Sequence, residues 1–164
     1  MTTTGPFTAE GGCTCGAVRF RLADRPLIVH CCHCRWCQRE TGSAFVLNAL
    51  IESARLQVTA GQAELVMTPS NSGKGQTIAR CPTCRIALWS HYAGLGDRMS
   101  FVRVGTLDEP DRFPPDVHIY TQSKQPWVVL PPGARAFGEY YKSGEVWSAE
   151  SLARRQALLA QPPR

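Results

Sequence analysis

The sequence predicts a mainly β fold of short antiparallel sheets, with a short helix in the first third of the chain and another near the C-terminus. Two observations predict it. Short apolar or alternating segments recur along the 164 residues, and turns rich in glycine and proline separate them. No solenoid repeat, low-complexity tract or long linker interrupts this pattern. We therefore expect residues 1–164 to form a single domain.

Most of the predicted elements are strands. Residues 17–22 alternate apolar and polar side chains, as a half-buried strand does. Residues 27–29 and 45–51 are short apolar runs that fit buried strands. Further strands are expected at 56–59, 64–67, 76–80, 87–92, 99–104, 117–120 and 127–130.

Two segments predict helices. Residues 35–41 follow the central cysteines and end at Gly42, and glycine is favoured directly after a helix. Near the C-terminus, Ser148 has the position of an N-cap, with Glu150 in the first turn and prolines at 162 and 163 as a stop signal. We expect this second helix to dock on the sheet.

The composition is that of a globular protein, with 43% hydrophobic and 19% charged residues. No secretory signal is apparent, and no apolar run approaches the ~20 residues of a membrane span. We therefore expect a cytoplasmic protein with reduced thiols, which argues against a disulfide framework. The formal charge is +5 and the pI about 8.9, but the arginines are scattered. Neither a nucleic acid nor a membrane is expected as a partner.

Eight cysteines form three clusters with the spacing of metal ligands. The clusters are Cys13-Thr14-Cys15-Gly16, Cys31-Cys32-His33-Cys34-Arg35-Trp36-Cys37 and Cys81-Pro82-Thr83-Cys84. Zinc prefers tetrahedral sets of thiolates, and two short cysteine loops can each supply two of them. Gly16 permits a sharp backbone turn after the first pair. We expect Cys13, Cys15, Cys81 and Cys84 to hold one structural zinc ion.

The middle cluster predicts a site of a different kind. Cys32, Cys34 and Cys37 can face one ion together, and a catalytic zinc keeps three protein ligands with the fourth position open. Cys31 would close the site as a fourth ligand, but adjacent side chains in an extended segment point to opposite faces. An iron–sulfur cluster is the alternative metal centre. We expect two zinc ions per chain, and none of the four histidines as a ligand.

Several motifs follow one another in a specific order from about Gly11 to the C-terminal helix. They are Gly12-Cys13-Thr14-Cys15-Gly16, Cys32-His33-Cys34-Arg35-Trp36-Cys37-Gln38-Arg39, Thr41-Gly42-Ser43-Ala44-Phe45, Cys81-Pro82-Thr83-Cys84, Gly105-Thr106-Leu107-Asp108, His118-Ile119 and Ser123-Lys124-Gln125-Pro126-Trp127. Together they resemble the glutathione-dependent formaldehyde-activating enzyme family, which also includes centromere protein V.

That resemblance implies coiled antiparallel sheets around zinc and carbon–sulfur lyase activity of the S-(hydroxymethyl)glutathione synthase type. It implies structural zinc ligands at Cys13, Cys15, Cys81 and Cys84 and catalytic zinc ligands at Cys32, Cys34 and Cys37. Arg85 departs from the family pattern, which usually has glycine after the second cysteine pair.

An open zinc site suggests thiol chemistry. Coordination to zinc deprotonates a thiol, so a zinc-bound thiol such as glutathione would add to formaldehyde or a related small aldehyde and give an S-hydroxymethyl adduct. Arg35 and Arg39, beside the cluster, would receive the carboxylates of this cosubstrate, or alternatively balance thiolate charge at the surface. The expected partners are therefore a small thiol and a small aldehyde.

Two other functions stay open at this point. The protein would be a carrier if it bound a thiol compound without catalysis. It would be an interaction module if both zinc ions were structural, although the chain has no basic or heptad-rich extension to support that function.

Overall fold

A computed structural model describes residues 7–160 and shows a mainly β protein with two sheets. The larger sheet has seven strands in the order β10-β3-β4-β9-β8-β7-β6. Their bounds are β3 Ile28–Cys32, β4 Val46–Glu52, β6 Glu64–Thr68, β7 Gln76–Arg80, β8 Ala87–Tyr92, β9 Met99–Arg103 and β10 Val117–Ile119. All neighbouring pairs are antiparallel except β10 and β3, which run parallel.

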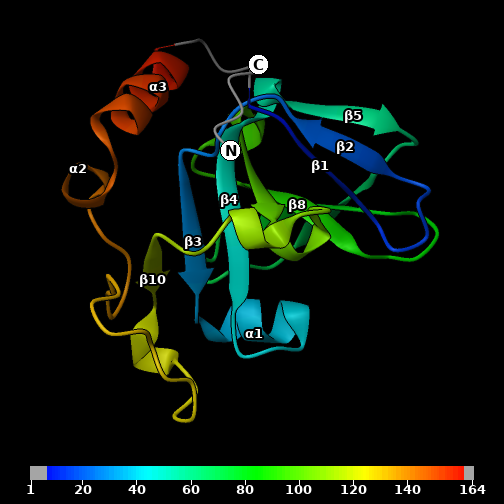
Figure 1. Cartoon of the computed structure of the whole chain (residues 1–164). Coiled ribbons are helices and arrows are strands. Elements are labelled where there is room, and N and C mark those ends of the chain that lie inside the picture. The colour runs from blue at the N-terminus through cyan, green and yellow to red at the C-terminus, as the bar shows by residue number, and fades with distance from the viewer. Residues whose placement is uncertain (1–6, 161–164) are drawn as a thin grey trace.

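The smaller sheet has three antiparallel strands in the order β1-β2-β5. They are β1 Ala9–Gly12, β2 Arg19–Leu22 and β5 Leu56–Ala60. Figure 1 shows this sheet on one side of the molecule, while α2 (Ser143–Val146) and α3 (Ala149–Leu159) lie on the other side. The turn between β1 and β2 carries the first cysteine pair, so this sheet positions half of one cysteine cluster.

Helix α1 (Arg35–Thr41) starts directly after the central cysteines, as predicted. Cys34 is its N-cap, and its Sγ accepts from the backbone N–H of Cys37. Gly42 ends the helix in the left-handed conformation, with φ 63° and its N–H bonded to Gln38 O. A residue with a Cβ adopts that conformation at a cost, which explains why glycine marks this end.

Helix α3 begins after Ser148, the predicted N-cap, whose hydroxyl accepts from the N–H of Ser151. Two contacts dock it on β4 and on the residue that precedes β3. Ser151 Oγ donates to Leu27 O at 2.7 Å, and Arg154 forms a two-pronged ion pair with Glu52 at 2.9 and 2.6 Å. None of the helices within residues 7–160 has the length and apolar character needed to cross a bilayer.

The core divides at β4. Ala49 and Ile51 belong to a cluster with Phe20 and Leu22 of the smaller sheet. Leu50, which alternates with them, belongs to a second cluster that includes side chains from the C-terminal segment. β4 is therefore buried on both faces.

The structure confirms the mainly β prediction and corrects four details. β1 was not predicted, because its sequence Ala-Glu-Gly-Gly is poor in strand-forming side chains. Gly11 in that strand leaves no room for a side chain: a Cβ there would lie 2.7 Å from both the Phe20 ring and Thr106 O. The short helix α2 was not predicted either.

Residues 127–130 do not form the predicted strand. Trp127 and Val129 are 72% and 87% exposed, so half of the apolar run faces solvent. The predicted antiparallel character also has one exception, because β10 returns to pair in parallel with β3.

Candidate metal centres

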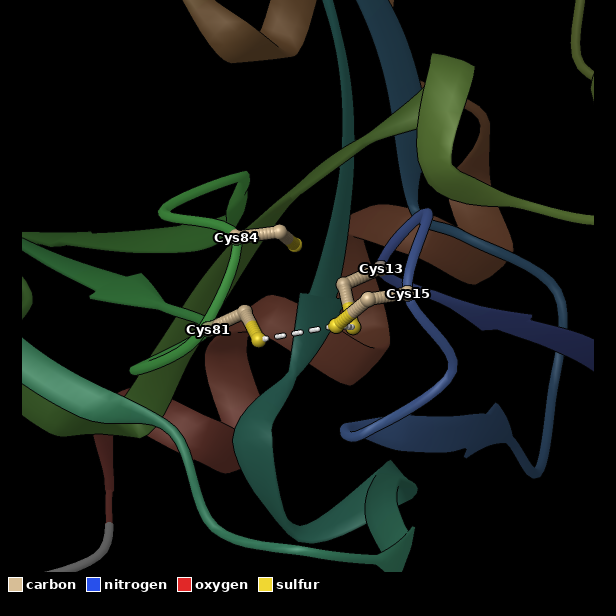
Figure 2. A group of neighbouring side chains, drawn as sticks. All are labelled: Cys13, Cys15, Cys81 and Cys84. Atoms are coloured by element: carbon tan, nitrogen blue, oxygen red, sulfur yellow. Dashed lines mark hydrogen bonds between the residues drawn. The ribbon is translucent and has the colours of Figure 1, made fainter.

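The two outer cysteine clusters meet at one point between the sheets. Cys13 and Cys15 come from the β1–β2 turn, whereas Cys81 and Cys84 come from the β7–β8 turn. Figure 2 shows the four side chains pointing toward one another. Sγ of Cys15 lies 3.5 Å from that of Cys13 and 3.7 Å from that of Cys81, and all four sulfurs lie within 4.8 Å. Tetrahedral zinc with Zn–S bonds of about 2.3 Å separates its sulfurs by about 3.8 Å, so the group fits this ion.

Backbone N–H groups point at these sulfurs, as is usual around bound thiolates. The N–H of Val18 donates to Cys13 Sγ at 3.3 Å. The N–H of Cys84 lowers the pKa of the Cys81 thiol, and the N–H of Ile86 lowers that of Cys84. Both effects favour the thiolate form that binds metal. Gly16 turns the first loop at φ 75°, as expected for a glycine in this place.

Arg85 has the backbone conformation of a glycine. Its φ is 63°, in the left-handed region that non-glycine residues occupy at a cost. Hydrogen bonds hold the turn in this form: Arg85 N donates to Cys81 O, and Cys81 N donates to Ile86 O, both at 3.0 Å. The departure at Arg85 therefore strains the turn without displacing Cys81 or Cys84 from the cluster.

The central cysteines form a separate group of three. Cys32 ends β3, Cys34 caps α1 and Cys37 lies in its first turn. Their sulfurs lie within 4.8 Å of one another, and all three residues are buried. Hydrogen bonds from Cys32 and Cys37 lower the pKa of Cys34 to about 3, and the same sharing raises the pKa of Cys32. The donors are all sulfur, which suits zinc.

A cavity of about 250 Å³ lies over this group. Cys32, Cys34 and Cys37 all line it. The other lining residues are His30, Trp36, Asn48, Ser70, Asn71, Ser72, Gln76, Tyr92, Gly94, Leu95, Phe101, Ile119, Tyr120 and Tyr140. Asn71 and Ser72 are exposed, so the cavity is open to solvent. The three-cysteine group is thus reachable by a small molecule.

Sequence reasoning did not identify the tyrosines of this cavity. Tyr92, Tyr120 and Tyr140 come from three distant segments, and no local motif marks them. Burial raises the pKa of Tyr92, and desolvation raises that of Tyr140 although this residue is 51% exposed, so both hydroxyls keep their protons at neutral pH. Tyr120 has φ 57°, a second non-glycine residue in the left-handed region.

Arg35 and Arg39 lie on α1 outside the cavity wall, and both are exposed. Arg35 Nη1 donates to Gln38 Oε1 at 2.9 Å. Among the described residues that line the cavity there is no lysine or arginine. Any group that binds the two arginines would therefore extend out of the cavity along α1.

Comparisons with known proteins show the family of the chain. The family model of the glutathione-dependent formaldehyde-activating enzyme matches residues 8–123. The chain belongs to this family. A protein of Halomonas elongata named "Putative glutathione-dependent formaldehyde-activating enzyme" is 26% identical over 125 residues, which are 74% of this chain and 80% of the relative. A crystal structure of a Rhodobacter sphaeroides protein is similar with a TM-score of 0.44 and 21% identity, covering 60% of this chain and 87% of that one.

Proposed function

We propose that the protein is a zinc-dependent carbon–sulfur lyase of the S-(hydroxymethyl)glutathione synthase type, which joins a glutathione-like thiol to formaldehyde or a related small aldehyde. The observation that carries the proposal is a group of three cysteines lining an open cavity, in a member of this family. Cys13, Cys15, Cys81 and Cys84 would hold a structural zinc ion, and Cys32, Cys34 and Cys37 a catalytic one.

Zinc bound by the three-cysteine group would lower the pKa of a thiol that takes its open position, which supplies a nucleophile at neutral pH. The overall reaction forms one S–C bond while the C=O π bond opens. The thiol proton ends on the former carbonyl oxygen. No oxidant or further reactant is needed.

The residues of the chain would supply positioning and hydrogen bonds. The protonated hydroxyls of Tyr92 and Tyr140 can donate to the carbonyl oxygen as it gains negative charge. Phe101 and Leu95 add apolar side chains to the cavity wall, against which the carbon atoms of a small aldehyde can pack. We propose that Arg35 and Arg39 receive the carboxylates of the thiol cosubstrate where it emerges from the cavity. The reducing cytoplasm is the proposed location, since the reaction needs free thiols.

The rate of adduct formation tests the proposal. Exchange NMR on an equilibrium mixture of glutathione and formaldehyde reports how fast the two forms interconvert. We expect the protein to accelerate this exchange, Cys34→Ser to abolish the acceleration, and Val129→Ser, a change at an exposed residue outside the cavity, to preserve it. Exchange equal to the uncatalysed rate, together with stoichiometric binding of glutathione, would identify a thiol carrier instead.

A further inference from the structure

A third group of metal-binding side chains lies on the face of β3 opposite the three-cysteine group. Cys31 lies in β3 and His33 directly follows the strand, and their side chains lie on the same side, 3.4 Å apart. Cys32 points to the other side, toward Cys34 and Cys37. The parallel strand β10 pairs His118 directly with Cys31. Residues far apart in the sequence thus place one sulfur and two ring nitrogens together.

The ligand atoms lie at metal-binding separations. His33 Nε2 is 3.4 Å from Cys31 Sγ and 3.1 Å from His118 Nδ1, and all three atoms lie within 4.8 Å. Tetrahedral zinc, with Zn–N of about 2.05 Å and Zn–S of about 2.3 Å, separates two nitrogens by about 3.3 Å and nitrogen from sulfur by about 3.6 Å. The separations between these ligand atoms match those around tetrahedral zinc as closely as the sulfur separations of the four-cysteine group do. All three residues are buried, His33 completely.

Hydrogen bonds alone satisfy this group poorly. Nε2 of His33 carries either one proton or one lone pair, yet it contacts both Cys31 Sγ and His118 Nδ1. If it donates to His118, it has no lone pair left for the Cys31 thiol. If it accepts from Cys31, a His118 proton would have to share the same lone pair. His33 Nδ1 has no partner in either arrangement, so it does not distinguish between them.

We propose that Cys31, His33 and His118 bind a third zinc ion, separate from the two thiolate sites. One thiolate and two imidazoles form a ligand set that zinc accepts readily. The ion would satisfy all three converging lone pairs at once. It would also tie β3 to β10. The backbone of His118 in β10 bonds the C-terminal segment twice, because His118 N donates to Arg135 O and His118 O accepts from Phe137 N. The role of this ion is therefore to fix the C-terminal segment on the sheet.

Zinc X-ray absorption tests this site without interference from the others. The other two groups contain only sulfur ligands, so imidazole scattering at the zinc edge reports the third group alone. We expect the protein, equilibrated with Zn²⁺ and freed of excess, to hold about three zinc ions per chain and to show imidazole scattering. A zinc content of two without that scattering overturns the proposal, whatever the outcome of the activity test.

A matched pair of histidine variants completes the test. His118→Gln should lower the zinc content by one ion and remove the imidazole scattering. His91→Gln is the control, because His91 lies outside the group and bonds Met99 O through Nδ1. Retention of the third ion in His118→Gln would contradict the proposal. If His118→Gln does not fold, the scattering of the unaltered protein decides alone.

Discussion

Cys31 and Cys32 are neighbours in β3, yet they belong to different groups on opposite faces of the sheet. Cys32 joins Cys34 and Cys37 beside the cavity, and Cys31 joins His33 and His118. The alternation of side chains along a strand causes this separation. It leaves the cavity-facing group with three sulfurs, the number that keeps a fourth position open for a substrate.

Replacing a ligand of the four-cysteine group should damage the fold. Cys15 and Cys81 are 66 positions apart, so the metal would join distant parts of the chain. Structural zinc contributes on the order of 10 kcal/mol, which is comparable with a domain's whole stability of ~5–15 kcal/mol. We expect Cys84→Ser to lower the thermal unfolding midpoint sharply or to yield insoluble protein, as measured by circular dichroism.

Cys34→Ser provides the contrast. Cys32, Cys34 and Cys37 lie within six residues of one another, so metal binding there cross-links little of the chain. We expect a soluble protein with one zinc ion fewer, a small shift in unfolding temperature and no thiol-dependent activity. Equal destabilisation by Cys34→Ser and Cys84→Ser would show that both ions are structural, as in an interaction module.

Arg85→Gly should be more stable than Arg85→Ala. Glycine adopts φ 63° without the clash that a Cβ causes, although it loses more entropy on folding. Arg85→Ala is the control, since it also removes the exposed ion pair with Glu64 but keeps the Cβ. We expect Arg85→Gly to be more stable than Arg85→Ala by about 0.5–1 kcal/mol, measured by urea unfolding of the zinc-loaded protein. Equal stability would refute the assignment of strain to this turn.

Arg154→Met should loosen α3 from the sheet. It leaves Glu52, whose side chain is only 9% exposed, without its two-pronged partner. Arg55 Nε still lies 3.4 Å from Glu52, so we expect a loss of about 2 kcal/mol, below the full cost of breaking a buried pair. Glu52→Gln in the same chain should recover part of this loss. Arg155→Met, next along α3, serves as the control and should change the unfolding free energy much less.

The two arginines of α1 should affect thiol binding rather than turnover. If Arg35 and Arg39 receive carboxylates, the double variant Arg35→Ala/Arg39→Ala should raise the KM for glutathione about tenfold, equivalent to ~1.4 kcal/mol, with little change in kcat. Steady-state rates with an uncharged thiol such as 2-mercaptoethanol give the control, and we expect no change there. An unchanged KM for glutathione would assign both arginines to charge balance at the surface.

The sequence predicted those features of the fold that depend on local patterns. The bounds of α1, the Ser148 cap and most strands follow from alternation, glycine at φ > 0 and capping side chains. It did not predict β1, whose strand forms by pairing with β2 despite a glycine-rich sequence. It predicted a strand at 127–130 because an apolar run reads as buried, and only the tertiary structure shows that Trp127 and Val129 face solvent.

The candidate sites also combine features that local sequence patterns predict with features that they do not. Cysteine spacing suggested the two thiolate groups, because the cysteines of each pair in the first group, and all three of the second group, lie close together in the sequence. The cavity tyrosines and the contact of His118 with His33 depend on how distant segments meet, and on the parallel pairing of β10 with β3. Such contacts have no local signature, so the histidines read as ordinary strand residues.

Cobalt substitution tests most directly whether the three-cysteine group offers an open metal position to a thiol. In protein carrying Co²⁺ in place of zinc, glutathione should change the thiolate-to-cobalt absorption of the unaltered protein. It should leave the spectrum of Cys34→Ser unchanged, because the four-cysteine group is closed and the buried group of Cys31, His33 and His118 does not line the cavity. A spectrum of the unaltered protein that does not respond to saturating glutathione would contradict the proposed thiol chemistry.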